Sequence, residues 1–284
     1  MKAAPFVHHA PTTADEAVAM LGRVAGEDGR VLAGGQSLVP TMAFRLARPA
    51  HLVDINNVAE LDVIAVEGDR LAIGALARHA AFTRPVVDGP LGRLLAFVTR
   101  HIAHLPIRVR GTFCGSLAHA DPASEWCLVA ATLGAEMTSR SLRGTRAIPA
   151  DEFFAGIMTT TLDEDELLVE ARLPLLSPDT RFGFDEFSRR AGDYALAMAL
   201  VTFRIEDGVI ASPRLGLGGA EAQPRRIPEA EAALAGRAPS PELFCAAAEA
   251  AAAAIDPLED LQADAEYRRD LVRVVVRRAL ERAV

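Results

Sequence analysis

The sequence predicts an α+β protein made of three consecutive units, at residues 1–57, 58–176 and 177–284. Three observations lead to this fold class. Short apolar strands alternate with helical stretches in the first two units, and a glycine-rich loop joins a strand to a helix or precedes a helix in each of them. The last unit instead has long strands followed by two long helices, which predicts a sheet covered by helices on one face.

Composition narrows the class of protein. Half of the residues are apolar and about a quarter are charged, as in ordinary globular chains. The net charge of −8 argues against a nucleic-acid partner. The N-terminus lacks the apolar core of a signal peptide, and no run of about 18 apolar residues predicts a membrane span. These features lead us to expect a cytoplasmic protein.

The cysteines limit the redox centres that the chain can hold. Cys114, Cys127 and Cys245 are the only three, and they show no Cys-x-x-Cys spacing. Three thiols cannot by themselves supply the four ligands of an iron–sulfur cluster. We therefore expect any such cluster to lie on another chain.

The first unit begins with a capped helix. Thr13 and Glu16 form a capping-box pattern at its start, and Gly22 is placed to end it. Two short strands follow, at residues 31–33 and 51–55. The glycine loop lies between these strands, at the tip of a small α/β unit.

That loop, residues 33–38, reads Ala-Gly-Gly-Gln-Ser-Leu. Gly34 and Gly35 carry no Cβ and can adopt positive φ, so a ligand can lie against bare backbone. Ser37 can cap the helix that follows, and Pro40 suits its first turn. Free amides at a helix N-terminus bind phosphate or pyrophosphate. The alternative is an ordinary strand-to-helix turn, since neither a P-loop nor a Gly-x-Gly-x-x-Gly motif is present.

The second unit opens with a predicted hairpin over residues 63–74, turning at Gly68-Asp69. A helical pattern follows over residues 91–103. His101 and His104 are three residues apart and would share a helix face, either as a metal pair or as polar residues lining a site or surface. Short strands and turns are expected over residues 135–176.

A second small-residue loop lies inside this unit. Residues 112–116 can present backbone amides to a ligand, with hydroxyls from Thr112 and Ser116. Asp121 is a natural N-cap for the next helix, with Pro122 as its first residue, and Gly134 is placed to end it. Two such loops could hold the two ends of one long phosphorylated ligand, and a dinucleotide has the natural size.

The third unit follows a predicted linker at residues 173–178. Its three strands are expected at residues 182–187, 195–205 and 209–217, and its two helices at residues 241–255 and 267–284.

Taken together, these motifs resemble a known family. The first loop, Gly111-Thr112-Phe113-Cys114-Gly115-Ser116, Ala120-Asp121-Pro122-Ala123, and Gly192-Asp193-Tyr194-Ala195 occur in the order found in the FAD-binding medium subunits of molybdenum hydroxylases. That family includes xanthine dehydrogenase and aerobic carbon monoxide dehydrogenase. The resemblance covers essentially the whole chain, and the set of motifs is far more specific than any one of them.

The resemblance implies a fold and a function. The fold is a two-subdomain FAD-binding domain of the PCMH type followed by a small α+β C-terminal domain. The chain would carry FAD and pass electrons from two [2Fe–2S] clusters on a small partner subunit to an external acceptor. A large partner subunit would hold the molybdopterin cofactor, and the assembly would be a dimer of heterotrimers. The resemblance implies no catalytic acid or base and no metal ligand here, because the protein supplies binding and orientation.

Matching positions give the expected FAD site. The first loop would hold the pyrophosphate, and the second would enclose the other side of the diphosphate and ribityl region. Glu125 matches an acidic position near the adenosine, Tyr194 an aromatic one covering the isoalloxazine, and two apolar residues pack on the cofactor. A first-turn helix charge and plain core packing are the alternatives for these four. The expected residues are Ala33, Gly34, Gly35, Gln36, Ser37, Leu38, Ile102, Thr112, Gly115, Ser116, Glu125, Leu168 and Tyr194.

Two questions stay open at this point. Cys114 stands where the family usually has glycine, and a cysteine accepts positive φ less easily. A redox role for its thiol is the less favoured explanation, and an extended backbone there is the simpler one. A self-sufficient flavin oxidoreductase on the same fold is the alternative function, and a non-catalytic nucleotide-binding module is another.

Overall fold

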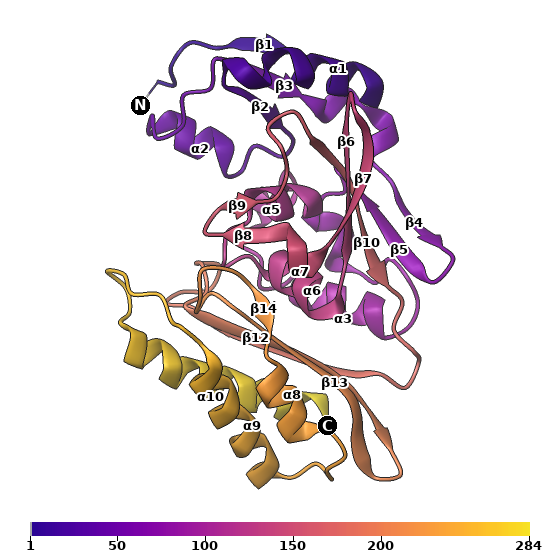
Figure 1. The fold of residues 1–284 in the computed structure, drawn as a ribbon, viewed down its shortest axis with the longest axis vertical. Coiled ribbons are helices and arrows are strands. Elements are labelled where there is room, and N and C mark those ends of the chain that lie inside the picture. Colours follow the sequence, from indigo (N-terminus) through magenta and orange to yellow (C-terminus); the bar gives the residue numbers. More distant parts are fainter. Residues whose placement is uncertain (1) are drawn as a thin grey trace.

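The computed structural model describes residues 2–284, which fold into the three sheet-containing layers shown in Figure 1. The first sheet is parallel, with strand order β1-β3-β2. Helix α1 packs on it, and the Thr13 hydroxyl accepts from Glu16 N at its start, as predicted. Gly22 does not end the helix, which continues to Val24. The elements are β1 (Val7–His9), α1 (Ala14–Val24), β2 (Gly29–Leu32), α2 (Leu38–Ala43) and β3 (His51–Asp54).

The second sheet is antiparallel, with strand order β4-β5-β10-β6-β7. The predicted hairpin forms its β4–β5 edge, where Glu67 pairs with Arg70 across the turn. Helices pack beside this sheet, and a small hairpin, β8–β9, completes the unit. The strands are β4 (Ile64–Glu67), β5 (Arg70–Gly74), β6 (Glu136–Ser141), β7 (Gly144–Pro149), β8 (Phe154–Gly156), β9 (Thr159–Thr160) and β10 (Leu167–Pro174). The helices are α3 (Pro90–Val98), α4 (Leu105–Arg108), α5 (Phe113–His119), α6 (Glu125–Leu133) and α7 (Ala150–Phe153).

Two helix predictions in this unit are wrong. The pattern over residues 91–103 is not one helix, because α3 ends at Val98 and a new helix, α4, begins at Leu105. Pro106 lies in the first turn of α4, where its missing N–H costs nothing, whereas in the interior of one continuous helix it would break the hydrogen-bond ladder. His101 and His104 therefore lie in the connection and share no helix face.

The start of α6 is the second error. Asp121 is not its N-cap, because the Asp121 carboxylate accepts from Ala123 N at 2.9 Å and the helix begins only at Glu125. This Asx turn uses the carboxylate four residues before the helix starts. The other end of the helix is as predicted, with Gly134 at φ +70°.

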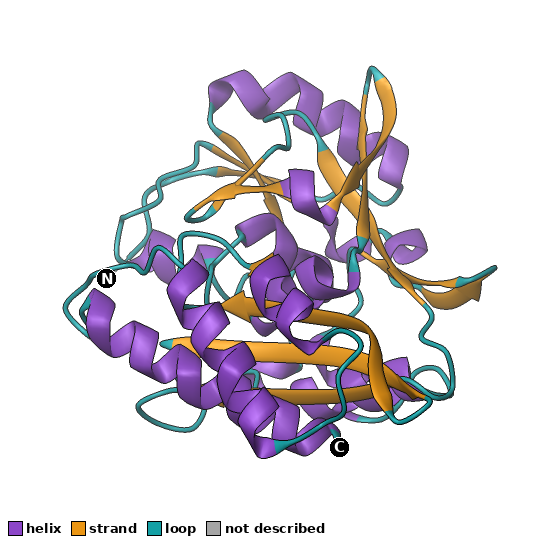
Figure 2. Cartoon of the chain, turned by 60° about the horizontal axis from the view of Figure 1, so that its bottom comes forward, coloured by secondary structure: helices purple, strands orange, loops and turns teal. Residues whose placement is uncertain are grey.

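The third sheet is antiparallel, with strand order β11-β12-β13-β14. Its three long strands and two long helices were predicted, whereas the short β14 and α8 were not. Helices α8, α9 and α10 cover one face (Figure 2), and α6 of the second unit packs on the other. The elements are β11 (Arg181–Phe187), β12 (Ala197–Glu206), β13 (Val209–Gly218), β14 (Arg225–Arg226), α8 (Pro228–Leu234), α9 (Pro241–Ala254) and α10 (Ala265–Ala283).

Two apolar cores stabilise these layers. The first runs continuously through the first two sheets and includes the buried Trp126, Phe113 and Phe153. The second lies between the third sheet and its helices. None of the helices in residues 2–284 combines the length and the apolar character that a membrane span requires.

Candidate functional site

The first glycine loop leaves its backbone donors open. Gly35 has φ +70°, as glycine permits, and its carbonyl accepts from Val39 N at 3.0 Å. Within residues 2–284 the amides of Gly34 through Ser37 donate to no other group of the chain. Ser37 is at the N-cap position of α2, but its side chain makes no capping bond, so that prediction is wrong. The loop therefore presents consecutive free N–H groups beside a helix N-terminus.

Gly34 brings this loop against the second one. Gly34 does not have a positive φ, so glycine is needed there only because a side chain would not fit. A Cβ at Gly34 would lie 2.4 Å from the Arg110 carbonyl oxygen and 2.6 Å from the Gly111 Cα. Both neighbours are backbone atoms, so the two loops pack main chain on main chain.

The second loop satisfies most of its own donors. Thr112 caps α5, since its hydroxyl accepts from Gly115 N at 3.0 Å and its carbonyl accepts from Ser116 N at 3.1 Å. Phe113 N donates to the Ala77 carbonyl at 2.9 Å. The expectation that all amides from Thr112 to Ser116 are available is therefore wrong for these three.

Cys114 lies in the first turn of α5, in a helical conformation. Cys114 therefore does not need a positive φ. The extended backbone that we expected there is wrong, because the residue is helical. The thiol is buried and donates to the Ile73 carbonyl at 3.4 Å. Burial raises the pKa of the Cys114 thiol, so it is neutral and shielded.

A pair of side chains fastens the two loops together. Asn56 donates from Nδ2 to the Ala33 carbonyl at 2.8 Å, at the start of the first loop. Arg78 donates from Nη2 to Asn56 Oδ1 at 2.6 Å and from Nη1 to the Arg110 carbonyl, at the start of the second loop. Sequence reasoning missed this Asn56–Arg78 clamp, because neither residue belongs to a motif.

His79 supports the second loop from behind. Its backbone N–H donates to the Gly111 carbonyl at 3.0 Å, and its Nδ1 accepts from Trp126 Nε1 at 3.0 Å. This bond places the ring proton on Nε2. Burial, together with the positive charges of Arg78 and Arg108, lowers the pKa of His79 to about 4. The ring is therefore neutral at physiological pH.

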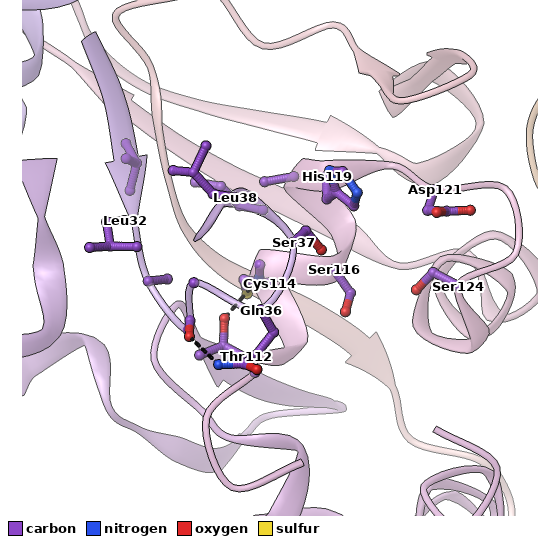
Figure 3. Close-up of a pocket in the computed structure, with 18 of the residues that line it drawn as sticks. Leu32, Gln36, Ser37, Leu38, Thr112, Cys114, Ser116, His119, Asp121 and Ser124 are labelled. Atoms are coloured by element: carbon purple, nitrogen blue, oxygen red, sulfur yellow. Dashed lines mark hydrogen bonds between the residues drawn. The ribbon is translucent and has the colours of Figure 1, made fainter. Parts of the chain in front are cut away.

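Both loops open onto one cavity of about 800 Å³. Figure 3 shows Gln36 and Ser37 of the first loop beside Thr112, Cys114 and Ser116 of the second. All thirteen residues that the sequence singled out line its wall, from all three units. His104, which the sequence offered as a polar residue lining a site or surface, is in the wall. Sequence reasoning missed further lining residues, among them His79, His119, Asp121, Ser124 and Asp193.

The third unit reaches the cavity through Tyr194, which is 64% exposed. The surrounding protein raises the pKa of its phenol, and the negative charges of Asp121 and Glu125 act in the same direction. The Ser37 side chain of the first loop acts in the opposite direction. Tyr194 is therefore a lining residue that bridges two units, and not an ordinary core tyrosine.

Glu125 lines the cavity at the first residue of α6. Burial raises its pKa to about 8, and the charges of Glu186 and Asp121 act in the same direction. At neutral pH the carboxyl group is therefore mainly protonated and can donate a hydrogen bond.

The two histidines have separate roles. His101 Nδ1 lies 3.2 Å from Glu186, while the His104 ring packs against Gly192, where a Cβ would lie 2.6 Å from its Cε1. Within residues 2–284 no group of three or more histidine, cysteine or acidic side chains is arranged to hold a metal.

Known proteins match this chain along its whole length. Residues 4–176 match the family model described as the FAD binding domain in molybdopterin dehydrogenase, and residues 182–283 match the CO dehydrogenase flavoprotein C-terminal domain. The nicotine 6-hydroxylase medium subunit of Paenarthrobacter nicotinovorans is 38% identical over 283 residues, covering 100% of this chain and 99% of that protein.

Solved structures agree with these matches. A chain of the carbon monoxide dehydrogenase from Hydrogenophaga pseudoflava superposes with a TM-score of 0.95 at 38% identity, covering 100% of this chain and 98% of the other. A chain of quinoline 2-oxidoreductase from Pseudomonas putida 86 gives 0.92 at 35% identity, with the same coverage.

Proposed function

This chain belongs to the FAD-binding medium subunits of the molybdenum hydroxylases, and we propose that the cavity between its two glycine loops is where it holds FAD. Its function is that of the flavoprotein component of such a complex, which passes electrons from [2Fe–2S] clusters of a partner to an external acceptor. No relative supports the alternative of a self-sufficient flavin oxidoreductase.

The observation that carries the proposal is the run of free amides from Gly34 to Ser37. Gly34 is buried and Gly35 to Ser37 are partly buried, so their amides need acceptors, and the oxygens of a pyrophosphate supply several at once. The cavity volume lies in the range of cofactor sites, and its apolar wall includes Ile102 and Leu168. The residues present therefore fit a flavin dinucleotide.

Each residue group has one task in this proposal. The first loop binds the pyrophosphate through its amides, and Thr112, Gly115 and Ser116 enclose its other side. Glu125 holds the adenosine end as a neutral hydrogen-bonding group. Tyr194 covers one face of the flavin and limits the access of water. FAD, when bound, supplies the electron-transfer chemistry.

Several finer statements belong to the same proposal. The units 1–57, 58–176 and 177–284 act as two FAD-binding subdomains and a C-terminal domain. The large and small partners assemble with the chain as a dimer of heterotrimers in the cytoplasm, where its three free cysteines stay reduced. Relatives named for nicotine and for carbon monoxide share this chain's fold, so substrate choice lies with a partner.

Titration of the flavin-free full chain tests the site. We expect it to bind about one FAD per chain and to regain flavin absorbance, and we expect ADP to compete with FAD more strongly than riboflavin, because the first loop recognises the diphosphate. Binding of riboflavin and FAD with equal affinity would contradict the assignment of the loop. Flavin found only on another subunit of the purified complex would refute the function.

A further inference from the structure

The loop at residues 188–195 joins β11 to β12 and carries Tyr194 to the cavity. Its base is closed by the bond from Leu196 N to the Phe187 carbonyl at 2.8 Å. The other hydrogen bonds of its backbone and of its serine and arginine side chains have partners within the loop or at the Gln262 carbonyl, which also belongs to the third unit. These bonds hold the loop to its own unit, and none of them determines how the loop lies against the second unit.

His104 provides a contact between this loop and the second unit. A Cβ at Gly192 would lie 2.6 Å from Cε1, 2.9 Å from Nδ1 and 3.1 Å from Nε2 of the His104 ring. The ring therefore fills the space that any side chain at residue 192 would need. His104, Gly192 and Tyr194 all line the cavity, and Gly192 is only two residues before Tyr194. The position of the ring can therefore decide where the phenol lies.

The backbone of His104 is held on both sides. Before it, Arg108 donates from Nη1 to the Ile102 carbonyl at 2.9 Å and to the Ala103 carbonyl at 3.0 Å. Ala103 has φ +39°, a conformation that persists in a residue with a Cβ only where the surroundings hold it. After it, the first turn of α4 donates to the His104 carbonyl from Ile107 N at 2.9 Å and from Arg108 N at 3.1 Å. The ring therefore projects from a fixed turn.

We propose that His104 is a positioning residue, whose ring seats the Gly192 backbone and thereby holds Tyr194 over the flavin. This inference rests on the proposed function, because it assumes that FAD lies in the cavity with Tyr194 on one face. The role requires no proton transfer, since a fixed ring against a glycine restricts the loop by contact alone. Without the ring, the loop can populate conformations in which the phenol leaves the flavin.

The test uses the full chain, both free of flavin and loaded with FAD. Arg189 and Arg190 are exposed at the start of the loop, so the rate of tryptic cleavage after them, measured by mass spectrometry, reports loop opening without any flavin. In the loaded chain, the emission of the bound flavin reports its cover, because a stacked phenol quenches flavin fluorescence. Tyr194→Leu gives the emission of the uncovered flavin.

His104→Ala should change both readouts. We expect cleavage of the flavin-free loop to become about fivefold faster. We expect the emission of bound flavin to rise about threefold, toward the level of Tyr194→Leu. The melting temperature should stay near that of the wild type, because His104 is exposed. In a chain that already carries Tyr194→Leu, His104→Ala should add no further emission, since His104 acts through Tyr194.

Gly192→Ala tests the same contact from the other side. Its Cβ would displace the loop from the ring, so cleavage and emission should again rise. Gly208→Ala is the matched control, because Gly208 has a similar φ (+80° against +86°) but no atom within 4 Å of the added Cβ. It should leave both readouts unchanged. Combining Gly192→Ala with His104→Ala should give no larger effect than His104→Ala alone, because the contact is then already lost.

The other outcomes are decisive against one of the two proposals. Unchanged cleavage in His104→Ala would overturn the positioning role, whether or not FAD binds. Faster cleavage with unchanged emission, where Tyr194→Leu does raise emission, would also overturn it, as would added emission in the Tyr194→Leu chain, which would make His104 a direct contact of the flavin. A wild-type chain without FAD would instead refute the proposed function, and the cleavage rates alone would then decide whether His104 seats the loop.

Discussion

The two glycine loops differ in where their amide hydrogens go. In the first, the amides from Gly34 to Ser37 have no partner within residues 2–284, whereas three of the five amides of the second, at residues 112–116, already have partners in the chain. The first loop is therefore completed by its ligand, and the second is already formed before the ligand arrives. It follows that changes in the first loop should act on FAD affinity, and changes in the second on chain stability as well.

The largest effect is expected where the loops meet. An alanine Cβ at Gly34 would lie 2.4 Å from the Arg110 carbonyl oxygen, and neither backbone can yield without separating the loops. We expect Gly34→Ala to weaken FAD binding by on the order of 100-fold and to lower the free energy of unfolding by about 1–3 kcal/mol. Flavin titration and urea unfolding measure the two quantities. Unchanged FAD affinity would show that the junction does not shape the site.

Gly35→Ala separates affinity from stability. Its φ of +70° disfavours a Cβ by about 1–2 kcal/mol. Because the free loop is not held by its amides, it can relax and then has to be restored by FAD, so affinity should fall about tenfold with little change in stability. Gly68→Ala is the matched control, since Gly68 also has positive φ (+62°) but lies in the β4–β5 turn. It should lose stability and keep full FAD affinity.

Thr112→Val tests the second loop in the opposite way. Loss of the cap on Gly115 N should lower the free energy of unfolding by about 1 kcal/mol and weaken FAD binding by about fivefold, since the frayed turn lines the cavity. Thr112→Ser retains the hydroxyl and should restore both. Thr13→Val removes the equivalent cap of α1, away from the cavity, and should lower stability alone. A Thr112→Val chain of normal stability but reduced affinity would contradict the contrast between the loops.

The sequence was sufficient for the features that depend on local chemistry. Glycines and prolines mark the loops and helix ends, so both loops, the hairpin at Gly68 and the end of α6 at Gly134 were predicted correctly. All thirteen predicted site residues line one cavity, although their contact with FAD stays a prediction.

Other features could not be predicted from the sequence, and the main one depends on contacts between residues far apart in the chain. The Asn56–Arg78 clamp is formed by hydrogen bonds to the Ala33 and Arg110 carbonyls, which no local pattern encodes. The late start of α6 has a different, local cause, because the Asp121 carboxylate can cap a helix or close an Asx turn with Ala123, and the residue types alone do not decide between the two.

A smaller effect is expected at Glu125, beyond the second loop, where stability and FAD affinity should both depend on pH. Its pKa of about 8 lies above the ordinary value of 4.5, so the native chain holds a proton that the unfolded chain releases between these values. The contribution of this group to stability is therefore present at low pH and falls as pH rises through that window. An anion there also opposes the FAD phosphates, so affinity should fall about threefold from pH 7 to pH 9. Glu125→Gln should flatten both profiles, and a wild-type profile that is already flat would refute the protonated carboxyl.

The smallest effect is expected at Cys114, and it sharpens the view that the second loop is a finished structure. Its thiol is buried and neutral, so an alkylating reagent should label the exposed Cys245 of the folded chain and leave Cys114 unmodified. Cys114→Gly places a glycine inside α5, which should lower the free energy of unfolding by about 1 kcal/mol. FAD affinity and the flavin reduction potential should stay unchanged, because the thiol donates to Ile73 and not to the cavity. A shifted potential in this variant would mean that the thiol acts on the cofactor, and the second loop would then be more than a rigid wall.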